Sequence, residues 1–239
     1  MKKIWYIGLL LLAWGCEKND VFVYDQPKSS IQFNYKPDKM KLEYNFAFQY
    51  KEKKKDPWGQ LQPFYLGDSL RRDTVDLYIS VLGLKEDIDR EFSLKQVLVK
   101  GQDSSMVADV EFLPPYYLRA GQLLDTIQVV LLRPDKRGKY TIGVTFDVND
   151  NSPFALGVQE QNVYQLNILD RYTEPADWRG YESFFGEFTE EKYAFYVTVL
   201  HKKFEGYMFY MDLDPLMEAL DEYNAAHPDA PKDFYFPGW

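Results

Sequence analysis

The feature that most constrains the fold is a repeated alternation of apolar and polar residues between residues 31 and 170. A period of two places every second side chain on the same face of a strand, so each alternating segment predicts a strand with one buried face. Turn-forming runs rich in Pro, Gly, Asn and Asp separate the segments, and no helical period comes between them. This order predicts a mainly-β chain folded as an antiparallel β-sandwich. The segments are residues 42–50, 75–82, 92–99, 107–113, 125–132, 139–148 and 162–169.

The pattern changes after residue 170, and residues 171–239 predict a smaller, aromatic-rich α+β module that follows the sandwich domain of residues 31–170. Residues 189–200 fit either a helix capped by Thr189 or a strand, because both periods are present. A second helix is predicted with Asp214 as its N-cap and Pro215 at its first position, where a missing N–H costs nothing.

The N-terminal residues predict an export signal. Lys2 and Lys3 precede an apolar run of residues 4–14, which is far shorter than the roughly 20 residues of a membrane-spanning helix. We therefore expect residues 1–15 to be a signal peptide that takes no part in the fold. The Gly15-Cys16 pair resembles a bacterial lipoprotein cleavage site, which implies a lipid such as palmitate on Cys16; a plain signal peptide is the alternative. Residues 16–30 then predict an acidic tether between that lipid and the folded part.

Charge and cysteine content exclude several classes of function. The formal net charge is -9, and a signal carrying two lysines makes the remaining chain more acidic still. Nucleic-acid phosphates repel such a chain, so we expect no nucleic-acid partner. The lysine-rich run of residues 51–55 is short, and we interpret it as a solvated hairpin tip. With its single cysteine at position 16, the chain has no thiol for a disulfide, a nucleophile or a metal ligand in the folded part.

No motif for catalysis is present, and we do not expect an enzyme. The chain has two histidines, His201 and His227, and they do not form the paired pattern of a zinc site, so we interpret them as scattered surface residues. Nucleophile-elbow and phosphate-binding glycine motifs are absent from the sequence. A hydrolase needs only two facing carboxylates, so an unrecognised pair is the alternative that the sequence leaves open.

One loop motif suggests calcium. The run Asp147-Val148-Asn149-Asp150-Asn151 is similar to the calcium-binding linker of cadherin repeats, and clustered Asp and Asn side chains supply the oxygens that Ca²⁺ prefers. The alternative is a turn between two strands, which Asn and Asp favour because they bond to their own backbone. We expect no obligatory cofactor, with calcium at Asp147, Asn149, Asp150 and Asn151 as the candidate.

Aromatic residues in turns are the candidate ligand-binding residues. Trp58 lies in an Asp-Pro-Trp-Gly turn, Tyr116 and Tyr117 follow a Pro-Pro turn, and Trp178 lies in an irregular segment. The apolar faces of sugars stack on exposed rings of this kind, so each residue is a possible platform for a glycan. The alternative is that these rings fold back over the sheet edges, and that Trp178 anchors the C-terminal module.

The order of several motifs resembles one family of surface lipoproteins. They are the lipoprotein signal ending at Cys16, residues 87–92 (Asp-Ile-Asp-Arg-Glu-Phe), residues 151–157, and Trp178 followed by residues 185–195. The chain is similar to a domain-of-unknown-function family, number 4843, of Bacteroides-type bacteria, encoded beside SusC/SusD-like uptake systems. The resemblance implies an Ig-like or Calx-β-like sandwich and no catalytic residues.

The same resemblance implies a cellular location and a role. It suggests a lipoprotein anchored in the outer membrane and exposed at the cell surface, which binds a nutrient glycan, or next a peptide, for a SusC/SusD-like importer. A structural scaffold subunit of that importer is the alternative, and a hydrolase is the third hypothesis.

Overall fold

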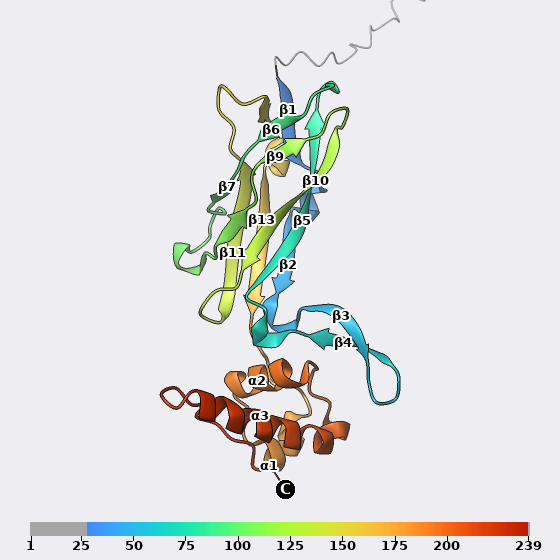
Figure 1. Ribbon diagram of the computed structural model, residues 1–239. Coiled ribbons are helices and arrows are strands. Elements are labelled where there is room, and N and C mark those ends of the chain that lie inside the picture. The colour runs from blue at the N-terminus through green and yellow to red at the C-terminus, as the bar shows by residue number, and fades with distance from the viewer. Residues whose placement is uncertain (1–27, 239) are drawn as a thin grey trace, which may run out of the picture.

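The computed structural model describes residues 28–238, with all side chains except those of residues 104 and 207–209. The predicted signal peptide and Cys16 lie outside the described residues, as does most of the predicted tether. Two β-sheets pack face to face, and a group of helices follows at one end (Figure 1). The prediction of a mainly-β chain with a sandwich and a smaller C-terminal module is confirmed. In the described part of the chain, no helix is long and apolar enough to cross a membrane.

The first sheet has five strands. Its long central strands, β5 (Arg72–Leu82) and β10 (Leu124–Leu132), pair in an antiparallel ladder from Leu124↔Ser80 to Leu132↔Arg72. Its spatial order is β12 (Phe154–Leu156), β1 (Ser29–Phe33), β5 (Arg72–Leu82), β10 (Leu124–Leu132) and β8 (Val110–Phe112).

The second sheet has four strands, and a small two-stranded ribbon accompanies it. The spatial order is β2 (Lys41–Asn45), β13 (Val163–Asp170), β11 (Gly138–Phe146) and β7 (Leu94–Val97), and the ribbon consists of β6 (Arg90–Phe92) and β9 (Tyr116–Leu118). Pairing within the two main sheets is antiparallel except where β12 joins β1 and β2 joins β13, which are parallel.

Alternation explains the sandwich core. Buried side chains from the inner faces of both sheets meet between them, as Phe33 and Phe146 do with ring centroids 4.6 Å apart. β1 begins at the end of the sandwich that lies farthest from the helices (Figure 1). The described chain therefore enters at one end, and the helical part follows at the other.

The helices form around a second hydrophobic cluster. They are α1 (Glu182–Phe185), α2 (Glu190–Leu200) and α3 (Leu213–Ala226). Of the two predictions for residues 189–200, the helix is correct, because the Thr189 hydroxyl accepts from the Lys192 N–H at 3.1 Å and caps α2. Buried rings of Trp178, Phe185 and Tyr196 fill the centre of this cluster.

The predicted start of the last helix is wrong. Asp212, not Asp214, is the N-cap residue of α3, and Pro215 is the third helical residue. Proline is tolerated there because the N–H groups of the first helical turn have no partner within the helix. The Asp212 side chain makes no capping bond, since its oxygens bond to Tyr196 and Lys202 instead.

The strand predicted over residues 42–50 is also interrupted. β2 ends at Asn45, a short 3-10 turn covers Phe46–Phe48, and β3 (Tyr50–Lys55) then pairs with β4 (Leu61–Tyr65) as a separate hairpin. The Asn45 side chain accepts from the Ala47 N–H at 3.0 Å and holds this turn. The interruption occurs because Phe46 packs in the sandwich core, whereas Ala47 belongs to the helical cluster.

Candidate functional site

The β3–β4 hairpin leaves the sandwich where the helices begin and extends beside them (Figure 1). The lysine run expected at a hairpin tip instead forms the arm β3, and the tip is the Asp-Pro-Trp-Gly turn. Asp56 organises this tip, because its Oδ1 accepts from the N–H groups of Trp58 at 3.0 Å and Gln60 at 2.8 Å. Gly59 has φ +83°, a backbone conformation that strongly favours glycine.

The base of the hairpin is fixed to the end of α2. His201 closes that helix in the left-handed conformation, with φ 56°. Its backbone carbonyl accepts from the Tyr65 N–H at 2.8 Å, and its ring Nδ1 lies 2.8 Å from the Tyr65 carbonyl oxygen. A carbonyl can only accept, so Nδ1 carries the proton. The His201 ring also stacks on Phe64, with centroids 3.9 Å apart, so hairpin and helix are held together at one point.

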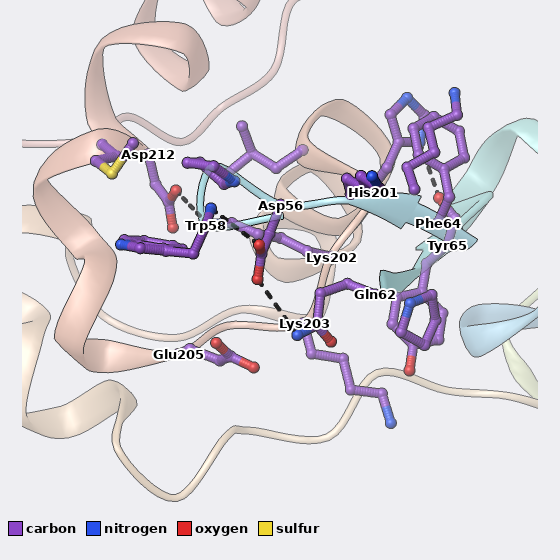
Figure 2. Close-up of a pocket in the computed structure, with 16 residues that line it drawn as sticks. Asp56, Trp58, Gln62, Phe64, Tyr65, His201, Lys202, Lys203, Glu205 and Asp212 are labelled. Carbon is purple, nitrogen blue, oxygen red and sulfur yellow. Dashed lines mark hydrogen bonds and ion pairs between the residues drawn. The ribbon is translucent and has the colours of Figure 1, made fainter. Parts of the chain in front are cut away.

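Between the hairpin and the helical part lies a pocket of about 470 Å³ (Figure 2). Its volume is within the range of about 300–1,000 Å³ that is usual for small-molecule sites. The hairpin supplies one wall and the segment after α2 supplies the other. The wall residues are Lys54, Lys55, Asp56, Pro57, Trp58, Gln62, Pro63, Phe64 and Tyr65 from the hairpin, and Leu200, His201, Lys202, Lys203, Glu205, Met211 and Asp212 from the helical part.

Trp58 is the exposed aromatic residue of this pocket. The residue is 58% exposed, although it belongs to the hairpin wall of the pocket. Figure 2 places the indole ring on the same side of the pocket as Asp212. An exposed, flat and apolar ring next to charged groups can stack on the face of a ligand while polar groups bind its substituents.

The charged groups of the pocket are of both signs. Lys202 pairs with Asp212 at 2.5 Å, and Lys203 lies 4.7 Å above the Phe48 ring and 5.3 Å above the Tyr65 ring. Lys54 lies over the Phe64 ring at 3.4 Å. The cation-π contacts hold these lysines against the aromatic base of the hairpin.

Asp212 is a buried carboxylate at the back of the pocket. It accepts hydrogen bonds from the Tyr196 hydroxyl and from Lys202. Burial raises the pKa of Asp212 above its ordinary value, although the two hydrogen bonds partly offset that effect. Burial raises the pKa of Tyr196 as well, and the neighbouring Asp212 charge adds to it.

Two of the four candidate aromatic residues are buried, which agrees with the alternative that such rings fold inward. Tyr116 is 6% exposed, and its hydroxyl accepts from the Leu113 N–H at 2.7 Å and donates to the Gln128 carbonyl at 2.9 Å. Trp178 is 0% exposed, and its indole N–H donates to the Gly186 carbonyl at 3.1 Å. Both rings fold inward because their polar atoms find backbone partners there.

Tyr117 is 42% exposed, on the ribbon strand β9 near the far end of the sandwich (Figure 1). Of the four predicted aromatic residues, Trp58 therefore lines the pocket and Tyr117 lies away from it.

The loop predicted to bind calcium is a turn closed by its own side chains. The Asn149 Oδ1 accepts from the Asn151 N–H at 2.9 Å, which forms an Asx turn, and Lys28 donates to the Asp150 carbonyl. The Asp147 carboxylate pairs with Lys95 at 2.8 Å. Among residues 28–238, no group of three or more His, Cys, Asp or Glu side chains is placed to hold a metal ion. Calcium at this loop stays a prediction.

The helical wall of the pocket is not marked by any of the sequence motifs described above. His201 was interpreted as a scattered surface residue, and Lys202, Lys203, Glu205 and Asp212 drew no attention. These residues come from a segment without a clear period, 136 to 147 positions after Tyr65, the last residue of the hairpin.

These features define a class: a β-sandwich with a helical C-terminal part and a hairpin that makes a pocket between them. The chain belongs to the family named Domain of unknown function (DUF4843), which matches residues 43–202. That range includes the whole hairpin wall of the pocket and part of the helical wall.

Solved structures of Bacteroides proteins are similar to part of the chain. A two-domain protein of unknown function from Bacteroides fragilis matches 60% of this chain and 46% of its own, at 11% identity and a TM-score of 0.35. A protein of unknown function from Bacteroides ovatus matches 59% and 44%, at 13% identity and a TM-score of 0.34. The chain thus spans less than half of the length of these two proteins. No relative was found among curated proteins.

Proposed function

We propose that this protein is a non-catalytic lipoprotein that binds a nutrient glycan at the cell surface for a SusC/SusD-like importer. The observation that carries the proposal is the exposed Trp58 ring at the mouth of a pocket of about 470 Å³. A glycan offers apolar ring faces for stacking and many hydroxyl groups for the polar wall. The lipoprotein signal that ends at Cys16 supports the cell-surface part of the proposal.

The test is binding of a panel of soluble polysaccharides to the full chain in detergent, measured by affinity gel electrophoresis. Trp58→Ala removes the stacking surface and should weaken glycan binding by about tenfold, since a buried aromatic contact contributes about 1–2 kcal/mol. Tyr117→Ala is the matched control, because it removes an exposed ring far from the pocket and should bind as the wild type does.

Two outcomes would contradict this assignment. If the wild-type chain retains no polysaccharide or peptide, the binding role is wrong. If Tyr117→Ala loses binding and Trp58→Ala does not, the ligand binds at the ribbon and not at the pocket.

We propose a non-catalytic role because two carboxylates of the pocket are bound by other groups of the protein. Asp56 accepts from the backbone of its own turn, and Asp212 is held by Tyr196 and Lys202. The raised pKa of Asp212 favours a hydrolase as the second candidate, since a protonated carboxyl can act as a general acid. Release of new reducing ends from a bound glycan, abolished in Asp212→Asn, would establish the hydrolase instead.

A further inference from the structure

The charge of the pocket is opposite to the charge of the whole chain. The chain carries 37 acidic and 28 basic residues and a formal net charge of -9. Four of the residues that line the pocket are lysines and three are carboxylates. A positive cavity on an acidic protein concentrates anions locally, because nearby charges dominate over distant, screened ones.

Two of the three carboxylates accept hydrogen bonds from other groups of the protein. Asp56 accepts from two backbone N–H groups of the hairpin tip, at 3.0 Å and 2.8 Å. Asp212 is buried and accepts from Lys202 and Tyr196, so one lysine of the pocket is neutralised with it. Asp56 and Glu205 keep their negative charges, so Lys54, Lys55 and Lys203 outnumber them by one. Lys54 also pairs with Glu52 at 3.1 Å, but both side chains are more than half exposed, so this pair is weak.

The lysines and the aromatic ring come from the same short hairpin. Lys54 and Lys55 end the strand β3, and Trp58 follows in the turn. All three residues line the pocket, two from the end of a strand and one from the turn that follows it. Such a combination matches a polymer that presents an apolar ring face and an anionic substituent on the same unit.

We propose that the pocket binds an anionic polysaccharide, in which carboxylate or sulfate groups on the sugars contact Lys54, Lys55 and Lys203 while a sugar ring stacks on Trp58. This inference rests on the proposed glycan-binding function and adds the chemical class of the glycan. Single-stranded nucleic acid shares the combination of flat rings and negative charge. Sites for single-stranded nucleic acid stack successive bases on aromatic rings along a basic groove, whereas the lining of this pocket offers one exposed ring, Trp58, so an oligonucleotide is the alternative that the experiment tests.

The experiment compares charged and neutral forms of the same backbone, with the full chain in detergent. The pairs are polygalacturonate with its methyl ester, dextran sulfate with dextran, and carboxymethyl cellulose with hydroxyethyl cellulose. A single-stranded oligonucleotide is a further arm. We expect at least one charged polymer to bind about tenfold more tightly than its neutral partner, and its affinity to fall as salt is raised.

Lysine variants test whether the charged polymer binds in the pocket. Lys55→Gln removes one charge from the pocket and should weaken binding of the charged polymer by about threefold, without changing binding of neutral polymers. Lys53→Gln is the matched control, because Lys53 is exposed on the same strand but does not line the pocket. Equal losses in Lys55→Gln and Lys53→Gln would overturn the assignment to the pocket.

The outcomes separate this inference from the function on which it rests. Equal or tighter binding of the neutral polymers overturns the anionic class and leaves glycan binding intact. Binding of none of the polysaccharides, charged or neutral, overturns both. Tighter binding of the oligonucleotide than of any polysaccharide also overturns both and indicates a nucleic-acid site.

Discussion

Arg133 connects the sandwich to the segment that carries the helices. Its guanidinium makes a bidentate pair with Asp170, at 2.8 Å and 2.7 Å, and a further bond to Asp68 at 2.8 Å. The same group donates to the carbonyl oxygens of Gly67 at 2.7 Å and Leu70 at 3.3 Å. Arginine suits this place because its planar, permanently charged fork provides five N–H donors.

The carboxylate of Asp68 stays ionised because arginine side chains surround it. Burial alone would raise the pKa of Asp68, but hydrogen bonding and charge from Arg137, with the charge of Arg133, outweigh that effect and hold the pKa below its ordinary value. The Tyr172 hydroxyl also donates to Asp68, at 3.1 Å. Tyr172 belongs to the helical cluster, so the charge network reaches both hydrophobic cores.

We expect Arg133→Ala to lower the free energy of unfolding by about 3–5 kcal/mol, because it removes the bidentate partner of the buried Asp170 and leaves only the longer contact with Arg137, at 3.6 Å. Urea unfolding followed by tryptophan fluorescence measures the change. Arg71→Ala is the control, since its partner Asp135 is almost fully exposed and such a pair contributes about 0–1 kcal/mol. Equal losses in the two variants would contradict a structural role for the buried network.

The pocket depends on the tip of the β3–β4 hairpin, whereas the fold does not. β3 is exposed along its whole length, and the tip residues contribute no side chain to either hydrophobic core. The base is different, because Phe48 and Tyr65 pack against the helical cluster. Loss of the tip should therefore remove one wall of the pocket and leave both cores unchanged.

Replacement of residues 56–60 by Asn-Gly tests this separation. Lys55 and Leu61 are paired residues, so a two-residue turn can join them in the same register. We expect the melting temperature to stay within a few degrees of the wild type and glycan binding to be lost, as measured by thermal unfolding and affinity gels. A cooperative loss of stability would show instead that the tip supports the fold.

Strand positions could be predicted at this scale because burial on one face leaves a period of two in the sequence. The ends of the elements could not, since they depend on which core each residue meets. Phe46 and Phe48 continue the alternation of β2, yet Phe46 packs in the sandwich and Phe48 against the helices. The start of α3 was displaced for a similar reason, because the Asp212 side chain bonds to distant residues and not to its own helix.

Of the two walls of the pocket, the sequence predicts part of the hairpin wall and not the helical wall. Trp58 could be recognised because a turn with Asp, Pro and Gly exposes whatever lies inside it. Tyr116 and Trp178 occupied comparable sequence contexts and are buried, because their hydroxyl and indole N–H groups find backbone partners. The helical wall could not be predicted, since the pairing of His201 with Tyr65 joins segments that no local pattern connects.

The whole molecule has a direction, with the start of the described chain at one end of the sandwich and the pocket beyond the other (Figure 1). For a protein held at a membrane, that direction decides which part meets the ligand. Cys16→Ser should release the full chain from the membrane fraction and abolish its labelling with palmitate, because the proposed lipoprotein carries its lipid on that thiol. Trp58→Ala should remain in the membrane fraction. Retention of Cys16→Ser in that fraction would contradict the lipid anchor.

The length of β5 sets the distance between the two ends of the sandwich. Its eleven residues run from the helical end of the sandwich to the end where β1 begins. At about 3.3 Å per residue, they span about 35 Å, which is comparable with the thickness of a bilayer core. With a lipid on Cys16, the sandwich would act as a spacer between the tether of residues 16–30 and the pocket. Its opening would then meet long polymers in the layer outside the membrane, before they reach a transporter embedded in it.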